Sequence, residues 1–141
     1  MERRAKRALV GVVSLALIVS LIGVLPVVAH RGVGPTCTIT AASKVISQGG
    51  TDALTVTITR GPHSVTLSAA IKVEHAGRHG KTSTDVTPID TNTAGTGTVT
   101  VTYPTDFPSP ASTSLLGGYS AGVSITGYSV AVSCGTTFGV N

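Results

Sequence analysis

The sequence predicts an all-β fold, a sandwich of about seven short strands, preceded by an N-terminal hydrophobic helix. Three observations favour this fold class. After Arg31 the composition shifts to Thr, Ser, Val and Gly, and the apolar residues show no helical periodicity. They alternate with polar residues instead, which is typical of strands that bury one face. Segments rich in Gly, Pro and Asn separate the alternating runs at the spacing expected of a sandwich or barrel.

The first 29 residues are expected to be a signal peptide or a membrane anchor. Four basic residues lie among the first seven, and residues 8–29 carry no charge and are rich in Leu, Val and Ile. A cationic start before an apolar run is the layout of a secretion signal, and positive flanks resist translocation. Everything after Ala29 is therefore expected to be extracytoplasmic, either secreted or anchored to the outer face of the cell membrane.

The processing of this leader stays open. Val27 and Ala29 are small residues at the positions that a signal peptidase reads, and Pro26 interrupts the helix before them. These features favour a cut after Ala29. Without a cut, residues 8–29 are long enough to span a bilayer and would tether the chain. In both cases residues 30–36 are expected to be a linker to a domain at 37–141.

A third form of processing would retain the apolar helix after a cut at its start. Lys6-Arg7-Ala8 before Leu9 resembles the short basic leader of type IV pilin-like proteins. The resemblance covers about the first 25 residues, and Val13 stands where many pilins carry an early acidic residue. It implies a filament subunit that begins at Leu9.

The expected strands come from five alternating segments and two weaker ones. The alternating segments are Leu54–Thr59, Ser64–Val73, Thr98–Tyr103, Tyr119–Ile125 and Tyr128–Cys134, the last with an extension through Phe138 and Val140. Cys37–Ala41 and Ser83–Ile89 are the weaker segments, and with them the count reaches about seven, the number expected of an immunoglobulin-like sandwich. Thr on the solvent face suits strands because its β-branch fits the pleat. The chain has no Trp, so the core must be mostly Val, Leu, Ile and Ala.

Several short motifs in these segments carry a family resemblance. Ile46–Thr51 (ISQGGT) precedes an alternating strand, and Leu116–Tyr119 (LGGY) opens another with a Gly-Tyr pair. Gly97–Pro104 (GTVTVTYP) and Phe138–Val140 (FGV) fit the later part of the same pattern. Together they resemble the immunoglobulin-like and macroglobulin-like modules of prokaryotic secreted or surface proteins over most of residues 37–140. The resemblance implies a structural, adhesive or binding module and supplies no catalytic residue.

The two cysteines, Cys37 and Cys134, are expected to form a disulfide bond. Outside the cytoplasm a cysteine pair is more often bridged than free. Cys37 lies on the first expected strand and Cys134 on the last, so a bridge would pin the two ends of the domain together. Two buried free thiols are the alternative.

The formal charge of +4 does not indicate a nucleic-acid-binding protein. Residues 1–29 hold four basic residues and one acidic residue, so most of the charge lies in the leader. The remaining chain holds six basic and five acidic residues, a net charge of +1. No stripe of Lys and Arg with interleaved aromatic residues is present. Nucleic acid is therefore not an expected partner.

Two patterns suggest chemistry, and each has a simpler explanation. Gly118-Tyr119-Ser120-Ala121-Gly122 matches G-x-S-x-G, but that motif needs a strand-to-helix turn and no helix is expected after it. Asp85, Asp90 and Asp106 could contribute to a calcium site, but no dense acidic loop is present. No catalytic residue, cofactor or metal is therefore expected.

A histidine at a new N-terminus is the metal-binding alternative. A cut after Ala29 would give His30 a free amine beside its imidazole, and such nitrogens suit Cu(II). Some copper oxygenases and periplasmic copper-binding proteins of immunoglobulin-like shape use such a histidine. His63, His75 or His79 could complete the site. The missing motifs of those families favour a linker histidine instead.

The sequence as a whole favours a non-catalytic structural or adhesive module of the cell surface or of a surface assembly. A disulfide-closed sandwich resists proteases, and unpaired strand edges can pair with partners. The expected partners are other envelope or surface proteins, further copies of the chain through strand edges, and the membrane through residues 8–29 if the leader is uncut. The pilin-like filament subunit and the copper-binding protein are the alternatives.

Overall fold

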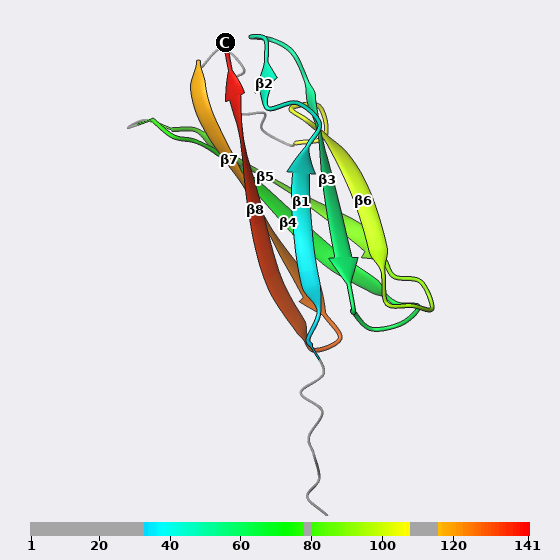
Figure 1. The fold of residues 1–141 in the computed structure, drawn as a ribbon. Helices are drawn as coiled ribbons and strands as arrows, with labels where there is room; N and C mark the ends of the chain where they lie inside the picture. The colour runs from blue at the N-terminus through cyan, green and yellow to red at the C-terminus, as the bar shows by residue number, and fades with distance from the viewer. Residues whose placement is uncertain (1–32, 78–79, 108–115) are drawn as a thin grey trace, which may run out of the picture. The chain divides into compact units, whose positions relative to one another are not determined.

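Eight β-strands in two sheets make up the part of the chain that the structure describes (Figure 1). The structure is a computed structural model that describes residues 33–77, 80–107 and 116–141. In chain order the strands are β1 (Thr36–Ala41), β2 (Val45–Ile46), β3 (Asp52–Thr59), β4 (Thr66–His75), β5 (Thr82–Asp90), β6 (Gly97–Tyr103), β7 (Gly117–Gly127) and β8 (Val130–Val140). The expected all-β class is confirmed, and the expected N-terminal helix lies outside the described residues. Those residues include no helix that is long and apolar enough to cross a membrane.

The two sheets differ in size and enclose one core. The first has the order β1-β3-β6 and the second the order β2-β8-β7-β4-β5. All pairings are antiparallel except that of β2 with β8. β5 pairs with β4 and not with β6. In a constant-type immunoglobulin domain, the strand at the place of β5 pairs with the equivalent of β6. It therefore belongs to the same sheet as the equivalents of β1 and β3. The domain is therefore a sandwich related to the immunoglobulin type, with β5 on the larger sheet.

The core follows from the alternation in the sequence. In β3, Leu54, Val56 and Ile58 are fully buried, and the residues between them face the other side. Burying an aliphatic side chain of this size stabilises the fold by about 1.5–3 kcal/mol. The buried hydrophobic residues are Ile39, Ile46, Leu54, Val56, Ile58, Leu67, Ala69, Ile71, Val73, Ile89, Val101, Tyr103, Phe107, Tyr119, Ala121, Val123, Ile125, Val130, Phe138 and Val140.

Aromatic side chains gather at one end of the sandwich. The ring centroid of Tyr103 lies 5.3 Å from that of Phe107 and 5.6 Å from that of Phe138. Tyr119 stacks on Phe138 at 5.4 Å, and His75 meets Tyr119 edge-on at 4.9 Å. Such pairs contribute about 0.5–1.5 kcal/mol each beyond the area that they bury. Aromatic packing therefore stabilises the end where β6 and β8 finish and β7 begins.

Two details of the strands differ from the expectation. β2 was not expected, because two residues are too few to show alternation. Backbone hydrogen bonds hold it to β8, such as the one from Gly139 N to Lys44 O at 2.8 Å. The count is therefore eight strands and not about seven. Tyr128 was expected to open the last strand on its core side, but it lies in the turn before β8 and is 68% exposed.

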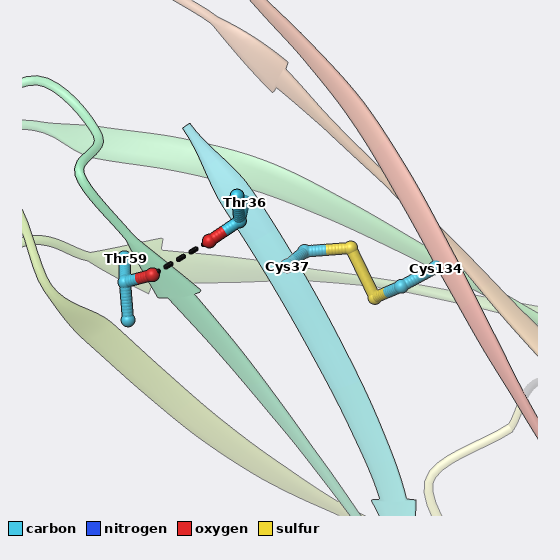
Figure 2. The surroundings of a disulfide bond; sticks show 4 residues. All are labelled: Thr36, Cys37, Thr59 and Cys134. Atoms are coloured by element: carbon cyan, nitrogen blue, oxygen red, sulfur yellow. Dashed lines mark hydrogen bonds between the residues drawn. A yellow bond between two sulfur atoms is a disulfide. The ribbon is translucent and has the colours of Figure 1, made fainter. Parts of the chain in front are cut away.

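The expected disulfide bond is present between Cys37 and Cys134 (Figure 2). Their Cα atoms are 5.8 Å apart, within the usual range for a bridge. Cys37 lies in β1 and Cys134 in β8, so the bond joins the margins of the two sheets. Figure 2 shows Thr36, the neighbour of Cys37, pointing away from the bridge toward Thr59 on β3. The bridge therefore occupies the inner side of β1, and threonine occupies the outer side.

Candidate functional site

The outer side of the three-stranded sheet is an array of threonines, which we call the threonine face. Its members are Thr36, Thr38 and Thr40 of β1, Thr55, Thr57 and Thr59 of β3, and Thr98, Thr100 and Thr102 of β6. The register sets them in rows across the strands, such as Thr38–Thr57–Thr98. Neighbouring strands lie about 4.8 Å apart and alternate residues of one strand about 6.7 Å apart. Asp52 is the charged residue of these three strands, and it is buried, so the face itself carries no charge.

Hydroxyl pairs order this face. The pairs, with the distance between their Oγ1 atoms, are Thr36–Thr59 (2.7 Å), Thr55–Thr100 (3.1 Å) and Thr57–Thr98 (3.2 Å). Each hydroxyl offers one donor and two acceptor positions, so a pair keeps one donor and three acceptor positions for a partner. The β-branched side chains are stiff at χ1 and lose little rotamer freedom on contact. The threonine face is therefore a preordered surface of hydroxyl and methyl groups.

The outer side of the five-stranded sheet is also poor in charge and contains a hollow. Gly135, Gly122, Lys72 and Thr84 lie side by side across β8, β7, β4 and β5. Gly122 has no side chain, and an open depression of about 390 Å³ lies over the sheet at this position. We call it the glycine hollow; its lining includes Ala70, Lys72, Gly122, Val123, Ser124 and Ser133. A second depression of about 520 Å³, lined among others by Thr66, Ser68 and Pro88, lies on the same side of the sheet.

Lys72 supplies the positive charge beside the glycine hollow. Its Nζ atom lies 2.5 Å from Oε1 of Glu74, and both side chains are about half exposed. A surface ion pair of this kind contributes little to stability, typically about 0–1 kcal/mol. Because solvent reaches the pair, the ammonium group of Lys72 stays accessible to a partner.

The hairpin between β7 and β8 presents an exposed tyrosine on an unusual turn. Gly127 and Val130 pair directly, so Tyr128 and Ser129 form a two-residue loop. Both have positive φ, 48° and 64°, as in a type I′ turn. That turn normally takes Asn-Gly, because other side chains are strained in the left-handed region. The chain therefore keeps a large aromatic residue at a position where its backbone is unfavourable.

The margins of the smaller sheet carry features that hinder the addition of another strand. On β6, Thr102 N donates to the carboxylate of Asp106, and Asp106 N donates to Thr102 O. At the other end of β6, Thr91 forms a bridge to Gly97. The other margin, β1, is joined covalently to β8. Occupied edge groups of this kind discourage pairing with another chain.

The margins of the larger sheet are protected in other ways. β5 contains Pro88, which has no N–H to donate, and the carboxylate of Asp85 accepts a hydrogen bond from Val86 N. β2 has only two residues and pairs with Gly139 and Val140, and the rest of the β8 edge lies beside β1, to which the disulfide bond joins it. Short strands and proline are common means of protecting sheet edges. The outer sides of the sheets therefore offer more open contact surface than the strand edges do.

The aspartates considered for calcium make local hydrogen bonds. Asp90 accepts one from Thr66 Oγ1, and Asp106 caps β6 as described above. Burial and, to a smaller extent, the charge of Asp106 raise the pKa of the Asp85 carboxyl, while the Val86 N–H bond lowers it. Among the described residues no group of three or more His, Cys, Asp and Glu side chains could hold a metal.

The serine of the G-x-S-x-G pattern lies within a strand. Ser120 is exposed in the middle of β7, opposite Glu74 of β4 and Thr137 of β8. The chain continues as a strand and then turns into β8, with no helix after the serine. The sharp strand-to-helix turn that this motif requires is therefore missing here.

Of the histidines proposed for copper, His75 has both ring nitrogens in hydrogen bonds. Gly77 N donates to Nδ1 at 3.1 Å, so Nε2 carries the proton and donates to Leu116 O at 2.9 Å. Neither nitrogen is open to a metal in this arrangement. His63 lies in the turn between β3 and β4, whereas His30 and His79 lie outside the described residues.

The chain matches no known family model and no curated protein, but its fold recurs in solved structures. One is the alkylpurine DNA glycosylase AlkC of Pseudomonas fluorescens, at 11% identity and a TM-score of 0.53, with 76% of this chain and 30% of that chain covered. Another is a β-glucosidase from Listeria innocua, at 10% identity and a TM-score of 0.50, with 76% and 16% covered. This chain thus spans less than a third of either enzyme. At such identities the likeness shows a shared β-sandwich architecture alone.

Proposed function

We propose that this chain is an extracytoplasmic structural or adhesive module of the cell surface or of a surface assembly, which acts by contact and not by catalysis. The threonine face is the observation that supports this most strongly. Nine threonines from three strands form an uncharged, ordered surface. Exposed sheet faces with Lys and Glu repel unmatched surfaces, whereas hydroxyl and methyl groups suit many neutral partners.

The two cysteines and the leader support the proposed location. Cys37 and Cys134 are bridged, and structural disulfides persist in oxidising compartments. The basic start and the apolar run of residues 8–29 are the features of an export signal. The partners would be other envelope or surface proteins, with the membrane as a further contact if residues 8–29 are retained.

Pairing through strand edges is a second route to the same function. The capping of β6 by Asp106 and the presence of Pro88 in β5 make this route less favourable than contact through the outer faces. A pilin-like filament subunit would also be extracytoplasmic, but its chain would begin at Leu9. The intact mass of the protein from its native host distinguishes cleavage after Ala29, cleavage after Ala8 and no cleavage.

Location is tested first, by protease treatment of whole cells that produce the full chain with a C-terminal tag. We expect the tag to be removed from the cell surface, or the protein to be found in the medium. Recovery of the protein from the cytosol, protected from protease, would refute the proposed location.

Contact through the threonine face is tested by sedimenting the purified protein with isolated cell envelopes. The variant Thr38→Lys/Thr98→Lys places two charges on this face, and Ser120→Lys/Thr137→Lys places two on the opposite sheet as a matched control. We expect only the first variant to lose binding. Binding of the wild-type protein should persist at about 0.5 M salt, where charge interactions are screened. Equal binding by both variants would show that the threonine face is not the contact surface.

A further inference from the structure

We propose that copies of this chain assemble head to tail, with Tyr128 of one copy seated in the glycine hollow of the next. The inference rests on the proposed function for its biological setting and names a partner for it, a second copy of the same chain. It joins two features on different parts of one molecule: an exposed aromatic side chain on the hairpin tip and an open hollow on the five-stranded sheet.

Tyr128 has the properties of a binding anchor. Its side chain is 68% exposed, although tyrosine has a large apolar ring that is normally at least partly covered. The type I′ turn holds it at a φ of 48°, where asparagine or glycine would be less strained. Strain of this kind is often retained where a side chain is needed for function. The two-residue loop places the ring at the tip of the β7–β8 hairpin.

The glycine hollow is complementary to a tyrosine ring. Ala70 and Gly122 give it an apolar base, and Lys72, whose ammonium group is paired with Glu74, lies beside it. An aromatic face attracts a cation, so a ring seated here would gain a cation–π contact with Lys72. The hydroxyls of Ser124 and Ser133 could hydrogen-bond the phenol group. The second depression on this sheet has no cationic residue in its lining, so it lacks this charge complementarity.

The arrangement of the two features determines the kind of assembly. Tyr128 and the hollow are separate patches, so a contact between them leaves one of each free on the resulting pair. Contacts of this type are heterologous and generate rings or open chains instead of closed two-fold dimers. The small side chains around the hollow, such as Ala70 and Ser133, allow the hairpin of the neighbouring copy to approach closely.

Two variants remove one half of the contact each while preserving the fold. Tyr128→Asn removes the ring and relieves the strained turn, so the folded chain should become more stable. Gly122→Val places a side chain in the hollow; its Cβ would have only Cys134 O within 4 Å, at 4.0 Å, so the Cβ meets no clash. Tyr128→Phe keeps the ring. Gly118→Val makes the same change on the same side of β7, where the nearest atom is 3.8 Å away, outside the hollow.

The test is analytical ultracentrifugation of the protein as its host processes it, from about 1 µM to about 1 mM. If residues 8–29 are retained, all variants are measured in the same detergent, so that this segment contributes equally. We expect the wild type, Tyr128→Phe and Gly118→Val to form a series of oligomers. Tyr128→Asn and Gly122→Val should each weaken association by about thirtyfold or more, as expected for loss of an anchor residue.

Mixing the two defective variants gives the decisive result. Tyr128→Asn retains the hollow and Gly122→Val retains the ring, so together they should form a 1:1 complex that grows no further. A wild type that stays monomeric, a Tyr128→Asn variant that assembles normally, or a mixture that forms no 1:1 complex would each overturn the proposal. These measurements use purified protein, so their outcome is independent of whether the chain is found at the cell surface.

Discussion

Removal of the disulfide bond should cost this domain a large part of its stability. The perturbation is the double variant Cys37→Ala/Cys134→Ala, or reduction of the wild type by dithiothreitol. The bridge joins residues separated by 97 positions. In the chain-entropy model, closing a loop of this length in the unfolded chain stabilises the fold by roughly 4–5 kcal/mol. Domains of this size are stable by only about 5–15 kcal/mol in total, so the loss is a large fraction.

The assay is thermal and urea unfolding followed by far-ultraviolet circular dichroism. For a domain of about a hundred residues we expect a fall in Tm on the order of 20 °C, for both the reduced wild type and the double variant. The double variant is the control for the reductant, because dithiothreitol should not change its melt. Equal Tm values for the oxidised and the reduced wild type would refute the reasoning. They would show that the disulfide bond does not stabilise the fold by lowering the conformational entropy of the unfolded chain.

Three further predictions concern single residues. Burial raises the pKa of Tyr103 to about 12, so between about pH 10 and pH 12 the unfolded chain loses a proton that the folded chain retains. The free energy of unfolding should therefore fall over this range by up to about 3 kcal/mol. Urea unfolding at each pH measures this fall. Burial also raises the pKa of the Asp85 carboxyl, so Asp85→Asn should raise Tm at neutral pH, and the gain should disappear below the ordinary carboxyl pKa of 3.8, where the wild-type group is protonated. Gly95→Ala should cost about 2 kcal/mol or more, because its Cβ would lie 2.2 Å from Gly61 O at a φ of 71°. Gly49→Ala is the control: at a φ of 79° with open space around it, it should cost about half as much. Equal Tm values for the two alanine variants would show that the clash of the Gly95→Ala Cβ with Gly61 O contributes nothing.

The fold class could be predicted from the sequence because the alternation is local. Leu54, Val56 and Ile58 are buried at every second position, as the pattern indicates. The short strand β2 could not be found this way, since its two residues are held by backbone bonds to β8 far along the chain. The sheet to which β5 belongs is likewise decided by non-local pairing with β4.

The position of Tyr128 shows where alternation of apolar and polar residues fails to predict burial. Tyr128 continues the alternation of Val130 and Val132, so the pattern predicts that it lies on the core side of the last strand. A two-residue turn interrupts this alternation at Tyr128 and Ser129. The pair lacks the Asn-Gly sequence by which such turns are recognised.

The sequence predicts the threonines of each strand of the threonine face, but it does not predict that the three strands lie side by side. The threonines alternate along β1, β3 and β6, but alternation does not say which strands are neighbours. The rows arise because the register sets Thr55 opposite both Thr40 and Thr100. Sheet order and register, which depend on contacts distant in the sequence, therefore turn three separate patterns into one surface.

The covalent link between β1 and β8 also determines how the domain would respond to mechanical force. Tension applied through residue 33 and residue 141 would enter at Cys37, cross the sulfur atoms to Cys134 and leave along the end of β8. The residues between the two cysteines lie outside this path and cannot be drawn out while the bond is intact. Only the short lengths of backbone beyond each cysteine could straighten, at no more than about 3.6 Å per residue. The oxidised domain would therefore behave as a nearly inextensible connector, and reduction would convert it into one that can lengthen by unravelling.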